Sequence, residues 1–336
     1  MFVALLERLQ RYEDLTSGEA SAAMGQLMDG AALPSQMAAL LMGLSLKGER
    51  PAEIVGFARA MRARAVALPR PAGDVFDTCG TGGDGAHTFN VSTAAAIVLA
   101  GAGVTVAKHG NRAVSSRAGS ADVFEALGIN LEAPPESVAT SLEHAHLAFF
   151  FAPMWHPSMR HAGPTRRELG LRTAFNLLGP LTNPAAPTSQ LVGVSRPEHT
   201  ELVARSLGEL GASRAWVVHG AGSLDEISTV GHTKVSELRG GTVNTFYVHP
   251  GDAGLQTSDR SALAGGTALE NAAMVERLLD GEHGPRRDVV LLNTAAALLI
   301  ADRVTNLREG MVRAAESIDS GKAKAVLAKL REVCGK

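Results

Sequence analysis

The sequence predicts an α/β protein, with a small all-helical domain followed by a large α/β domain whose mostly parallel central sheet is covered by helices. Three observations support this prediction. Residues 1–68 show only the periodicity of helices, and from Val75 onward short β-rich runs alternate with helical segments. Such alternation is typical of parallel strands joined by crossover helices. The chain of 336 residues is also longer than a single hydrophobic core usually supports.

Four helices are expected in the first domain, which we place at residues 1–69. Thr16 and Glu19 have the spacing of a capping box, which predicts the start of the second helix. The third is expected at Gln36–Leu46, and Pro51 suits the first position of the fourth. The apolar residues that recur at helical spacing are Leu5, Leu6, Leu9, Met37, Leu40, Leu41, Leu44, Ile54, Phe57, Ala58 and Met61.

The α/β domain is placed at residues 70–336. Its strands are expected at Val75–Thr78, Val104–Ala107, Ala148–Phe151, Gln190–Val194, Ala215–His219 and Thr242–Val248. The helices between them are expected at Thr93–Ala100, Ser137–Glu143, Thr200–Leu210 and Met274–Asp280. Within residues 164–180 the pattern returns to that of a helix, and we expect this segment to pack against the first domain.

Composition excludes several classes of protein. A formal net charge of −2 gives no electrostatic attraction toward nucleic acid or membranes. Cys79 and Cys334 are far apart, which argues against a disulfide framework or a zinc site and fits a reducing cytoplasm. No targeting segment is visible, and the most apolar stretches, Val91–Ala107 and Val289–Ala301, are shorter than about 18 residues. We expect a soluble cytoplasmic protein.

Residues 80–85, GTGGDG, form a glycine-rich turn after the first predicted strand. The turn matches the GxGxxG pattern of dinucleotide-binding folds, but its context does not. The following helix is expected only at Asn90-Val91-Ser92-Thr93, and the next strand ends in Lys108 where that motif needs an acidic residue. Glycines do leave backbone N–H groups free to face an anion, and a helix start adds more of them. The turn therefore indicates a phosphate site.

Two neighbouring segments add side chains suited to a phosphorylated ligand. Asn90, Ser92 and Thr93 stand at the expected helix start, and Ser92 could also bind a metal; alternatively they form only an N-cap. Lys108 heads the loop 108–112 at the carboxyl end of the next strand, the edge at which open α/β sheets bind ligands. The alternative for this loop is a solvated basic turn.

These residues belong to longer motifs, which occur in the order GTGGD, NVST, KHGNRAVSSRAGSADVFEALG, HPSMR, FNLLGPLTNP and DEIS. From its helical N-terminus to its last helix, the chain resembles the anthranilate phosphoribosyltransferase family. The resemblance implies transfer of the phosphoribosyl group of phosphoribosyl pyrophosphate (PRPP) to the amino group of anthranilate, giving phosphoribosylanthranilate and pyrophosphate in tryptophan biosynthesis. It also implies a homodimer joined through the helical domains.

The resemblance further implies roles for individual residues. PRPP is expected to bind Gly80, Gly83, Asp84, Thr88, Asn90, Val91, Ser92, Thr93, Lys108, His109, Gly110, Asn111, Arg112, Ala113, Val114, Ser115, Ser116 and Ser120. Anthranilate is expected near Gly80, Asn111, Arg166, His156 and Pro180, with His109 on its approach. Mg²⁺ is expected to be held by Ser92, Asp225 and Glu226. No nucleophile or certain general base is expected, and Arg166, Asn111 and His109 would position the substrates.

The side-chain chemistry of the acidic pair and of Arg166 agrees with the roles that the resemblance implies. Asp225 and Glu226 follow a predicted strand and offer hard oxygen ligands to Mg²⁺, although such a pair taken alone reads as surface charge. Arg166 offers a planar fork to a carboxylate, but Arg160, Arg167 and Arg172 lie nearby, and the sequence does not choose among them. The family commonly has glycine in place of Ser223, and a smaller aromatic in place of Trp155.

Anthranilate's amine is neutral at pH 7, so the barrier lies in breaking the anomeric C–O bond. We expect a Mg²⁺-assisted, dissociative displacement with inversion, and closure of the helical domain over the substrates. Two alternatives share this fold: a pyrimidine-nucleoside phosphorylase and a non-enzymatic nucleic-acid-binding relative. The second would need a basic face, which a net charge of −2 does not favour.

Overall fold

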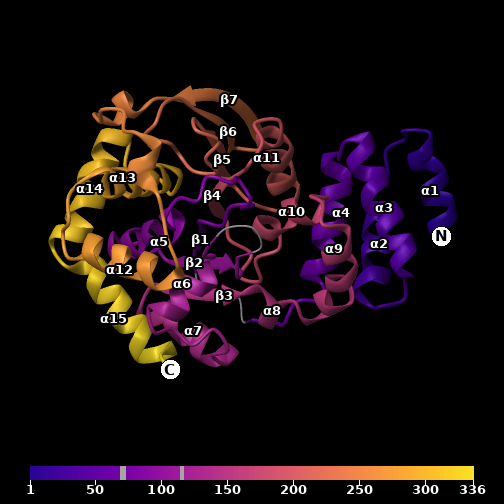
Figure 1. Cartoon of the computed structure of the whole chain (residues 1–336), viewed down its shortest axis with the longest axis horizontal. Coiled ribbons are helices and arrows are strands. Elements are labelled where there is room, and N and C mark those ends of the chain that lie inside the picture. The colour runs from indigo at the N-terminus through magenta and orange to yellow at the C-terminus, as the bar shows by residue number, and fades with distance from the viewer. Residues whose placement is uncertain (69–72, 114–116) are drawn as a thin grey trace.

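The computed structural model describes residues 1–68, 73–113 and 117–336. A bundle of the N-terminal helices forms one end of the elongated molecule, and a larger α/β body forms the other (Figure 1). The order of elements agrees with the predicted fold class, an all-helical unit followed by alternating strands and helices. Within the described part of the chain, no helix is both long enough and apolar enough to cross a membrane.

The helical domain contains the four expected helices. They are α1 (Phe2–Gln10), α2 (Ser17–Met28), α3 (Pro34–Lys47) and α4 (Pro51–Arg62). The capping box that starts α2 is formed: the Glu19 amide donates to Thr16 Oγ1 at 3.2 Å, and the Thr16 amide donates to Glu19 at 2.8 Å. Pro51 stands at the first position of α4, where its missing N–H costs no hydrogen bond. Both helix starts were therefore predicted correctly.

A seven-stranded sheet forms the centre of the α/β body, in the order β3-β2-β1-β4-β5-β6-β7. The strands are β1 (Phe76–Asp77), β2 (Val106–Gly110), β3 (Leu147–Phe151), β4 (Ser189–Gly193), β5 (Arg214–Gly220), β6 (Thr233–Arg239) and β7 (Thr242–Val248). The first five pair in parallel, whereas β6 and β7 are antiparallel additions at one edge. The prediction of a mostly parallel sheet is confirmed.

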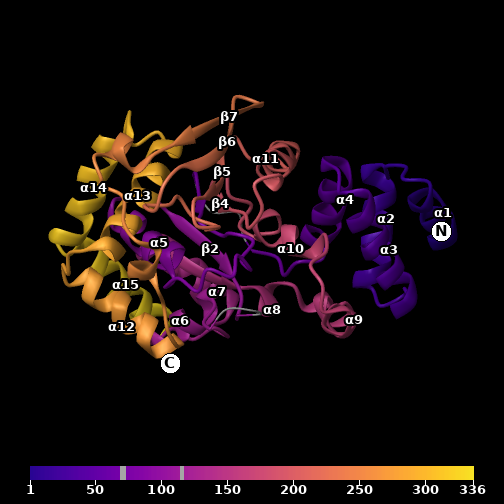
Figure 2. The same ribbon diagram turned by 45° about the horizontal axis from the view of Figure 1, so that its top comes forward.

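Helices cover both faces of the sheet, as the two views in Figures 1 and 2 show. The longer helices of this domain are α5 (Val91–Gly101), α6 (Ser120–Ala126), α7 (Pro135–His144), α11 (His199–Glu209), α12 (Ala268–Leu279), α13 (Pro285–Ile300), α14 (Leu307–Asp319) and α15 (Lys322–Cys334). The sequence analysis did not identify β6, α6, α14 or α15, and it described the region of α13 only as an apolar stretch. In β6 the polar residues Thr233 and Ser236 are buried beside Val235 and Leu238, so the sequence shows no regular alternation of apolar and polar residues.

Alternating residues of β5 join two different cores. Trp216 and Val218 belong to the hydrophobic cluster that includes α5 and α13. Ala215 and Val217 point to the opposite face, where the cluster continues through α11 into the helical domain. The helical domain is thus attached to one face of the sheet by a continuous apolar contact.

A connecting segment runs between the two parts of the molecule. It consists of α8 (Ala152–Trp155), η1 (Pro157–His161), α9 (Gly163–Leu169), α10 (Phe175–Leu178) and η2 (Gly179–Leu181). Helix α9 packs against α3, α10 packs against α4, and η1 packs against α2. Parts of the segment 157–178 thus contact the helical domain. Trp155 packs on Phe150 in the α/β core, with 4.8 Å between the ring centroids.

Candidate active site

The glycine turn follows β1 at the carboxyl edge of the sheet. Gly82, Gly83 and Gly85 adopt φ values of +64°, +71° and +68°, which residues with a Cβ atom rarely adopt. Helix α5 begins only at Val91. The prediction that the turn does not lead straight into a helix, as a dinucleotide-binding motif would, is therefore confirmed.

The acidic pair lies against this turn. The Gly82 N–H donates to Asp225 Oδ2 at 3.0 Å, and the N–H of Ser92, in the first turn of α5, donates to Glu226 Oε1 at 3.2 Å. The loop after β5 that carries both carboxylates thus joins two segments that the sequence analysis had assigned to the phosphate site. Asp84 joins the group because the Asp225 N–H donates to its Oδ2 at 3.4 Å.

A side chain of α13 hydrogen-bonds the backbone next to the acidic pair. Asn293 of α13 accepts a hydrogen bond from the Ile227 N–H at 3.0 Å and donates to the Ile227 carbonyl at 2.9 Å. Ser223 adopts φ of +61°, in the left-handed region. Glycine adopts that conformation without strain, whereas a serine adopts it less readily.

Electrostatics at the pair favour a cation. Loss of hydration, together with the charge of Asp84, raises the pKa of Asp225 above its usual range. Loss of hydration and the charge of Asp225 likewise raise the pKa of Glu226. The described residues contain no group of three His, Cys, Asp or Glu side chains arranged to hold a metal. A metal here would therefore need ligands in addition to the pair, such as the Ser92 hydroxyl.

Lys108 is more buried than a phosphate-binding lysine in an open loop would be. Its side chain is 1% exposed, and its Nζ donates to the carbonyl and the hydroxyl of Thr78, at 3.1 Å each. The charge of Lys108 lowers the pKa of Asp77 and of Glu226, which opposes the effect of burial on both. The ammonium group thus lies within the network at the ends of β1 and β2.

The loop after β2 meets the start of α6. A Cβ atom on Gly110 would lie 2.2 Å from Ser120 Oγ, so these two predicted PRPP residues are in contact. Arg112, in contrast, donates to Asp122 and Glu125 of α6 at 2.9 and 2.7 Å. Thr88 pairs with Ala264 in an isolated β-bridge. The predicted residues Val114, Ser115 and Ser116 lie outside the described residues.

Two buried histidines form the wall beside this loop. The rings of His109 and His156 meet edge to face, with centroids 5.4 Å apart. His109 Nδ1 lies 2.9 Å from the Gly179 carbonyl, next to Pro180. Burial lowers the pKa of His109 to about 3 and that of His156 to about 4, so both rings are neutral at pH 7. Neutral, buried rings fit a wall for an aromatic ligand.

Arg166 projects from α9, on the side of the helical domain. Its guanidinium lies over the Phe175 ring, 4.7 Å from the centroid, and burial lowers its pKa. Among the described contacts, no hydrogen bond or ion pair joins Arg166 to Gly80, Asn111 or the histidine pair. Among the described residues, no hydrogen bond or ion pair joins the Arg166 guanidinium to another side chain.

Family models match both parts of the chain. A model described as "Glycosyl transferase family, helical bundle domain" matches residues 3–65, and one described as "Glycosyl transferase family, a/b domain" matches residues 72–324. Anthranilate phosphoribosyltransferase from Symbiobacterium thermophilum is 56% identical over 329 residues, covering 98% of this chain and 96% of that protein. The chain belongs to the anthranilate phosphoribosyltransferase family. It is therefore an enzyme that transfers a pentosyl group.

Solved structures of the family agree with the fold. Anthranilate phosphoribosyltransferase from Thermus thermophilus superimposes with a TM-score of 0.91 at 46% identity, covering 97% of this chain and 99% of that one. The enzyme from Saccharomyces cerevisiae, solved in complex with PRPP and Mg, gives a TM-score of 0.90 at 28% identity, covering 99% and 97%. These comparisons favour the phosphoribosyltransferase over the nucleoside phosphorylase and the nucleic-acid-binding alternatives.

The structure adds residues to the site that the sequence analysis had missed. Asp77 is buried and accepts hydrogen bonds from the His109 N–H at 3.2 Å and from Asn183 Nδ2 at 2.8 Å. Gly193, at the end of β4, accepts a hydrogen bond from the Thr81 N–H at 2.8 Å. Arg172 had been one of four undecided arginines, and it donates to the glycine turn. The DTCGTGG run contained a signal for Asp77, since the residue lies three positions before Gly80.

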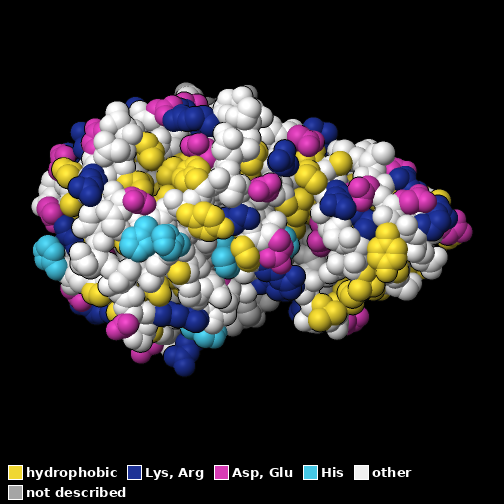
Figure 3. Space-filling model, turned by 90° about the horizontal axis from the view of Figure 1, so that it is seen from above, with side chains coloured by type: hydrophobic (Ala, Val, Ile, Leu, Met, Phe, Trp, Pro, Cys, Tyr) yellow, Lys and Arg dark blue, Asp and Glu magenta, His cyan; other side chains and the backbone are white. Residues whose placement is uncertain are grey.

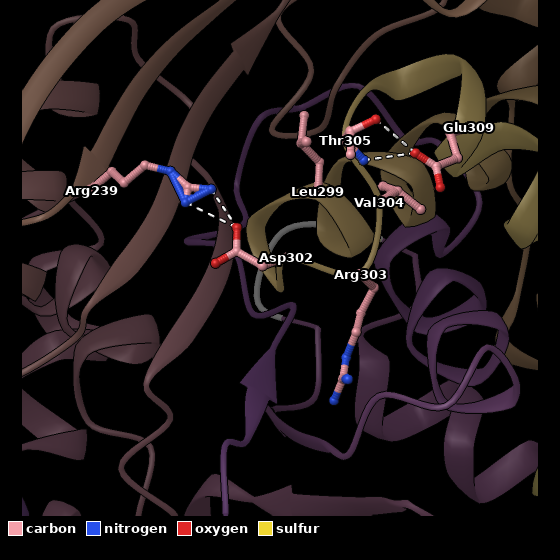
Figure 4. A pocket seen from close by; sticks show the side chains of 7 residues that line it. All are labelled: Arg239, Leu299, Asp302, Arg303, Val304, Thr305 and Glu309. Atoms are coloured by element: carbon pink, nitrogen blue, oxygen red, sulfur yellow. Dashed lines mark hydrogen bonds and ion pairs between the residues drawn. The ribbon is translucent and has the colours of Figure 1, made fainter.

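A surface hollow of about 340 Å³ lies elsewhere, between β6 and the turn from α13 to α14 (Figure 4). Asp302 lines it and forms an ion pair with Arg239, whereas the Arg303 side chain points away from that pair. The hollow shares no residue with the glycine turn or with the acidic pair. It is therefore separate from the candidate active site.

Proposed function

We propose that this chain joins anthranilate to PRPP at the carboxyl edge of the parallel strands, between the glycine turn, the start of α5 and the Asp225–Glu226 loop. One observation supports this assignment above all others. Gly82 and Ser92, from the two segments that suit a phosphate, each donate a backbone N–H to one carboxylate of the pair. Phosphate-binding backbone and metal-binding carboxylates thus occupy one site, which is what a diphosphate bound with a divalent cation needs.

The donor site consists of the residues that the family resemblance assigns to PRPP. The glycine turn would supply backbone N–H groups to the diphosphate, and the first turn of α5 would add its N–H groups and its positive dipole. Lys108 would hold the ends of β1 and β2 together through Thr78, and its charge would favour an anion at this edge. The contact of Gly110 with Ser120 would shape the wall beside the ribose.

Asp225, Glu226 and Ser92 fit Mg²⁺. Both carboxylates have raised pKa values because they are desolvated and lie near other acidic groups, so a divalent cation would relieve an existing repulsion. Carboxylate and hydroxyl oxygens are the ligands that Mg²⁺ prefers. Bound Mg²⁺ would offset the negative charge that develops on the departing pyrophosphate.

The acceptor site lies on the side of the connecting segment. Arg166 would bind the carboxylate of anthranilate through its planar fork, while His109, His156 and Pro180 would contact the ring. The buried imidazoles are neutral and make poor bases at pH 7. The anilinic nitrogen needs no strong base, so these residues would act by positioning the amine near the anomeric carbon.

The displacement would be dissociative and inverting, with pyrophosphate departing ahead of attack by the amine. Closure of the helical domain toward the α/β domain would bring the acceptor residues to the donor and exclude water. The continuous apolar contact between α4, α10 and α11 would guide such a motion.

We also propose that the enzyme is a cytoplasmic homodimer joined through the helical domains. Large hydrophobic side chains exposed there support this arrangement: Val3 is 68% exposed, Tyr12 70% and Leu46 73%. Figure 3 shows hydrophobic side chains at the surface of this end of the molecule. Helices α1 and α3 pack against each other, so Val3 and Leu46 belong to one pair of helices.

Loss of anthranilate fluorescence in the presence of PRPP and Mg²⁺ tests the proposed reaction. We expect consumption that stops when EDTA removes the metal and resumes when excess Mg²⁺ is added. Consumption that continues in EDTA would overturn the metal assignment. Absence of consumption with PRPP still bound would overturn the acceptor assignment.

A further inference from the structure

Arg172 connects the connecting segment to the glycine turn. Its Nη1 donates to the Gly83 carbonyl at 2.5 Å, and its Nη2 donates to the Gly82 carbonyl at 3.3 Å. The arginine follows α9 after Gly170, which ends that helix in a left-handed conformation. One guanidinium therefore binds two successive carbonyls across about 90 positions of sequence.

The fit between Arg172 and the turn is close. A Cβ atom on Gly83 would lie 2.3 Å from Arg172 Nη1, which is closer than real contacts allow. Gly83 also has φ of +71°. The positive φ favours glycine at this position, and the guanidinium would have to shift to admit a larger residue.

Asp225 holds the same turn from the other side. The Gly82 N–H donates to Asp225 Oδ2 at 3.0 Å, while the Gly82 carbonyl accepts from Arg172. The orientation of Gly82 is thus fixed by the Asp225 carboxylate on one side and by the Arg172 guanidinium on the other. Burial and the charge of Arg196 lower the pKa of Arg172, and the charges of Asp225 and Asp84 oppose that effect.

Arg172 also links the helical-domain side of the molecule to the α/β domain. Helix α9, three residues before it, packs against α3 of the helical domain and carries Arg166. The glycine turn belongs to the α/β domain, directly after β1. Arg172 thereby bridges the acceptor side and the donor side of the site.

We propose that Arg172 is a positioning residue for the phosphoribosyl transfer: it holds the glycine turn in the orientation that binds the donor's diphosphate. This inference rests on the donor site proposed above. The guanidinium fixes the two carbonyls, and the Gly82 N–H of the same turn points to Asp225. Loss of Arg172 would leave three glycines at positive φ free to adopt other conformations.

The test compares Arg172→Ala and Arg172→Lys with Arg308→Ala. Arg308 is a matched control, because its guanidinium also donates to two successive carbonyls, those of Asp252 at 3.3 Å and Gly251 at 3.5 Å, in a loop outside the site. Steady-state kinetics give KM for PRPP, KM for anthranilate and kcat. Calorimetry of Mg²⁺ with pyrophosphate measures donor-side binding without turnover, and thermal melting reports on folding.

We expect Arg172→Ala to raise KM for PRPP about tenfold or more and to weaken pyrophosphate binding equally, with KM for anthranilate changed less than about threefold. Arg172→Lys should recover part of the loss, since an ammonium can reach one carbonyl but cannot bridge two. Arg308→Ala should have the same kinetic constants and the same pyrophosphate affinity as the parent enzyme. If Arg172→Ala does not fold, the same measurements on Arg172→Lys test the inference.

Parental KM for PRPP in both Arg172 variants would overturn the inference. An increase confined to KM for anthranilate would also overturn it, because Arg172 would then bind the acceptor's carboxylate. Failure of the parent enzyme itself to bind pyrophosphate would overturn the donor site, whereas equal binding by the parent and by Arg172→Ala would remove only the role of Arg172.

Discussion

Gly193 and Asp225 are in direct backbone contact, since a Cβ atom on Gly193 would lie 1.5 Å from the Asp225 carbonyl oxygen. The carbonyl of Gly193 also accepts the Thr81 N–H, and Gly80 lies against both residues. The end of β4 therefore sets the distance between the glycine turn and the acidic pair. No side chain takes part in this contact.

Gly193→Ala should lower kcat/KM by about 100-fold, because the new methyl group must displace the Asp225 backbone by an ångström or more. The fluorescence assay for anthranilate checks this. Gly18→Ala is the matched control: no heavy atom lies within 4 Å of a Cβ there, and alanine favours the helix that Gly18 occupies. Equal activity of the two variants would show that the loop tolerates the displacement.

Asp225→Asn and Glu226→Gln should each lower kcat/KM by about 100-fold or more and should raise the Mg²⁺ concentration needed for half-maximal activity. Each substitution keeps the shape of the side chain but removes a charged oxygen ligand. A Mg²⁺ titration of the rate measures both effects. Asp302→Asn, which changes a remote carboxylate in an ion pair with Arg239, should leave the titration unchanged. A parental Mg²⁺ dependence in both site variants would contradict the assignment.

The contribution of His109 and His156 to the free energy of unfolding should fall as the pH drops below about 6.5, whereas the buried carboxyls with raised pKa values contribute with the opposite sign. His109 and His156 have pKa values of about 3 and about 4 when folded, so they are neutral in the native state and take up protons on unfolding. Each histidine makes the free energy of unfolding rise with pH by up to about 1.4 kcal/mol per pH unit. This dependence extends from the pKa of the folded histidine up to about pH 6.5.

His109→Asn should reduce that slope by about 1 kcal/mol per pH unit between pH 6 and 4. Urea unfolding at a series of pH values provides the measurement. His144→Asn, an exposed position at the end of α7, should keep the parental slope. An unchanged slope in His109→Asn would mean that the buried ring takes up its proton in the folded state.

Val3→Glu combined with Leu46→Glu should convert a homodimer to a monomer, because two charges would then be buried in the proposed interface on α1 and α3. Light scattering coupled to size exclusion measures the mass. Leu269→Glu is the control: this leucine is 74% exposed on α12 of the α/β domain and should leave the mass unchanged. A monomeric parent, or a dimer that survives the double substitution, would place the interface elsewhere.

Much of the fold could be predicted because its signals are local. The capping box at Thr16, the proline at residue 51 and the glycine turn act within a few residues of themselves, and each lies where the pattern placed it. Strand β6 escaped prediction because the buried polar residues Thr233 and Ser236 interrupt its apolar pattern. Its identity as a strand depends on pairing with β5 and β7.

The sequence by itself determined the fold class, the glycine turn and the family, because those features are encoded in contiguous motifs. Only the tertiary structure decided which arginine reaches the turn, that Lys108 is buried against Thr78, and that Gly193 supports Asp225. These contacts join residues from about 30 to about 90 positions apart, through backbone atoms whose positions depend on strand order and loop path. Residue type alone carries no information about such distances.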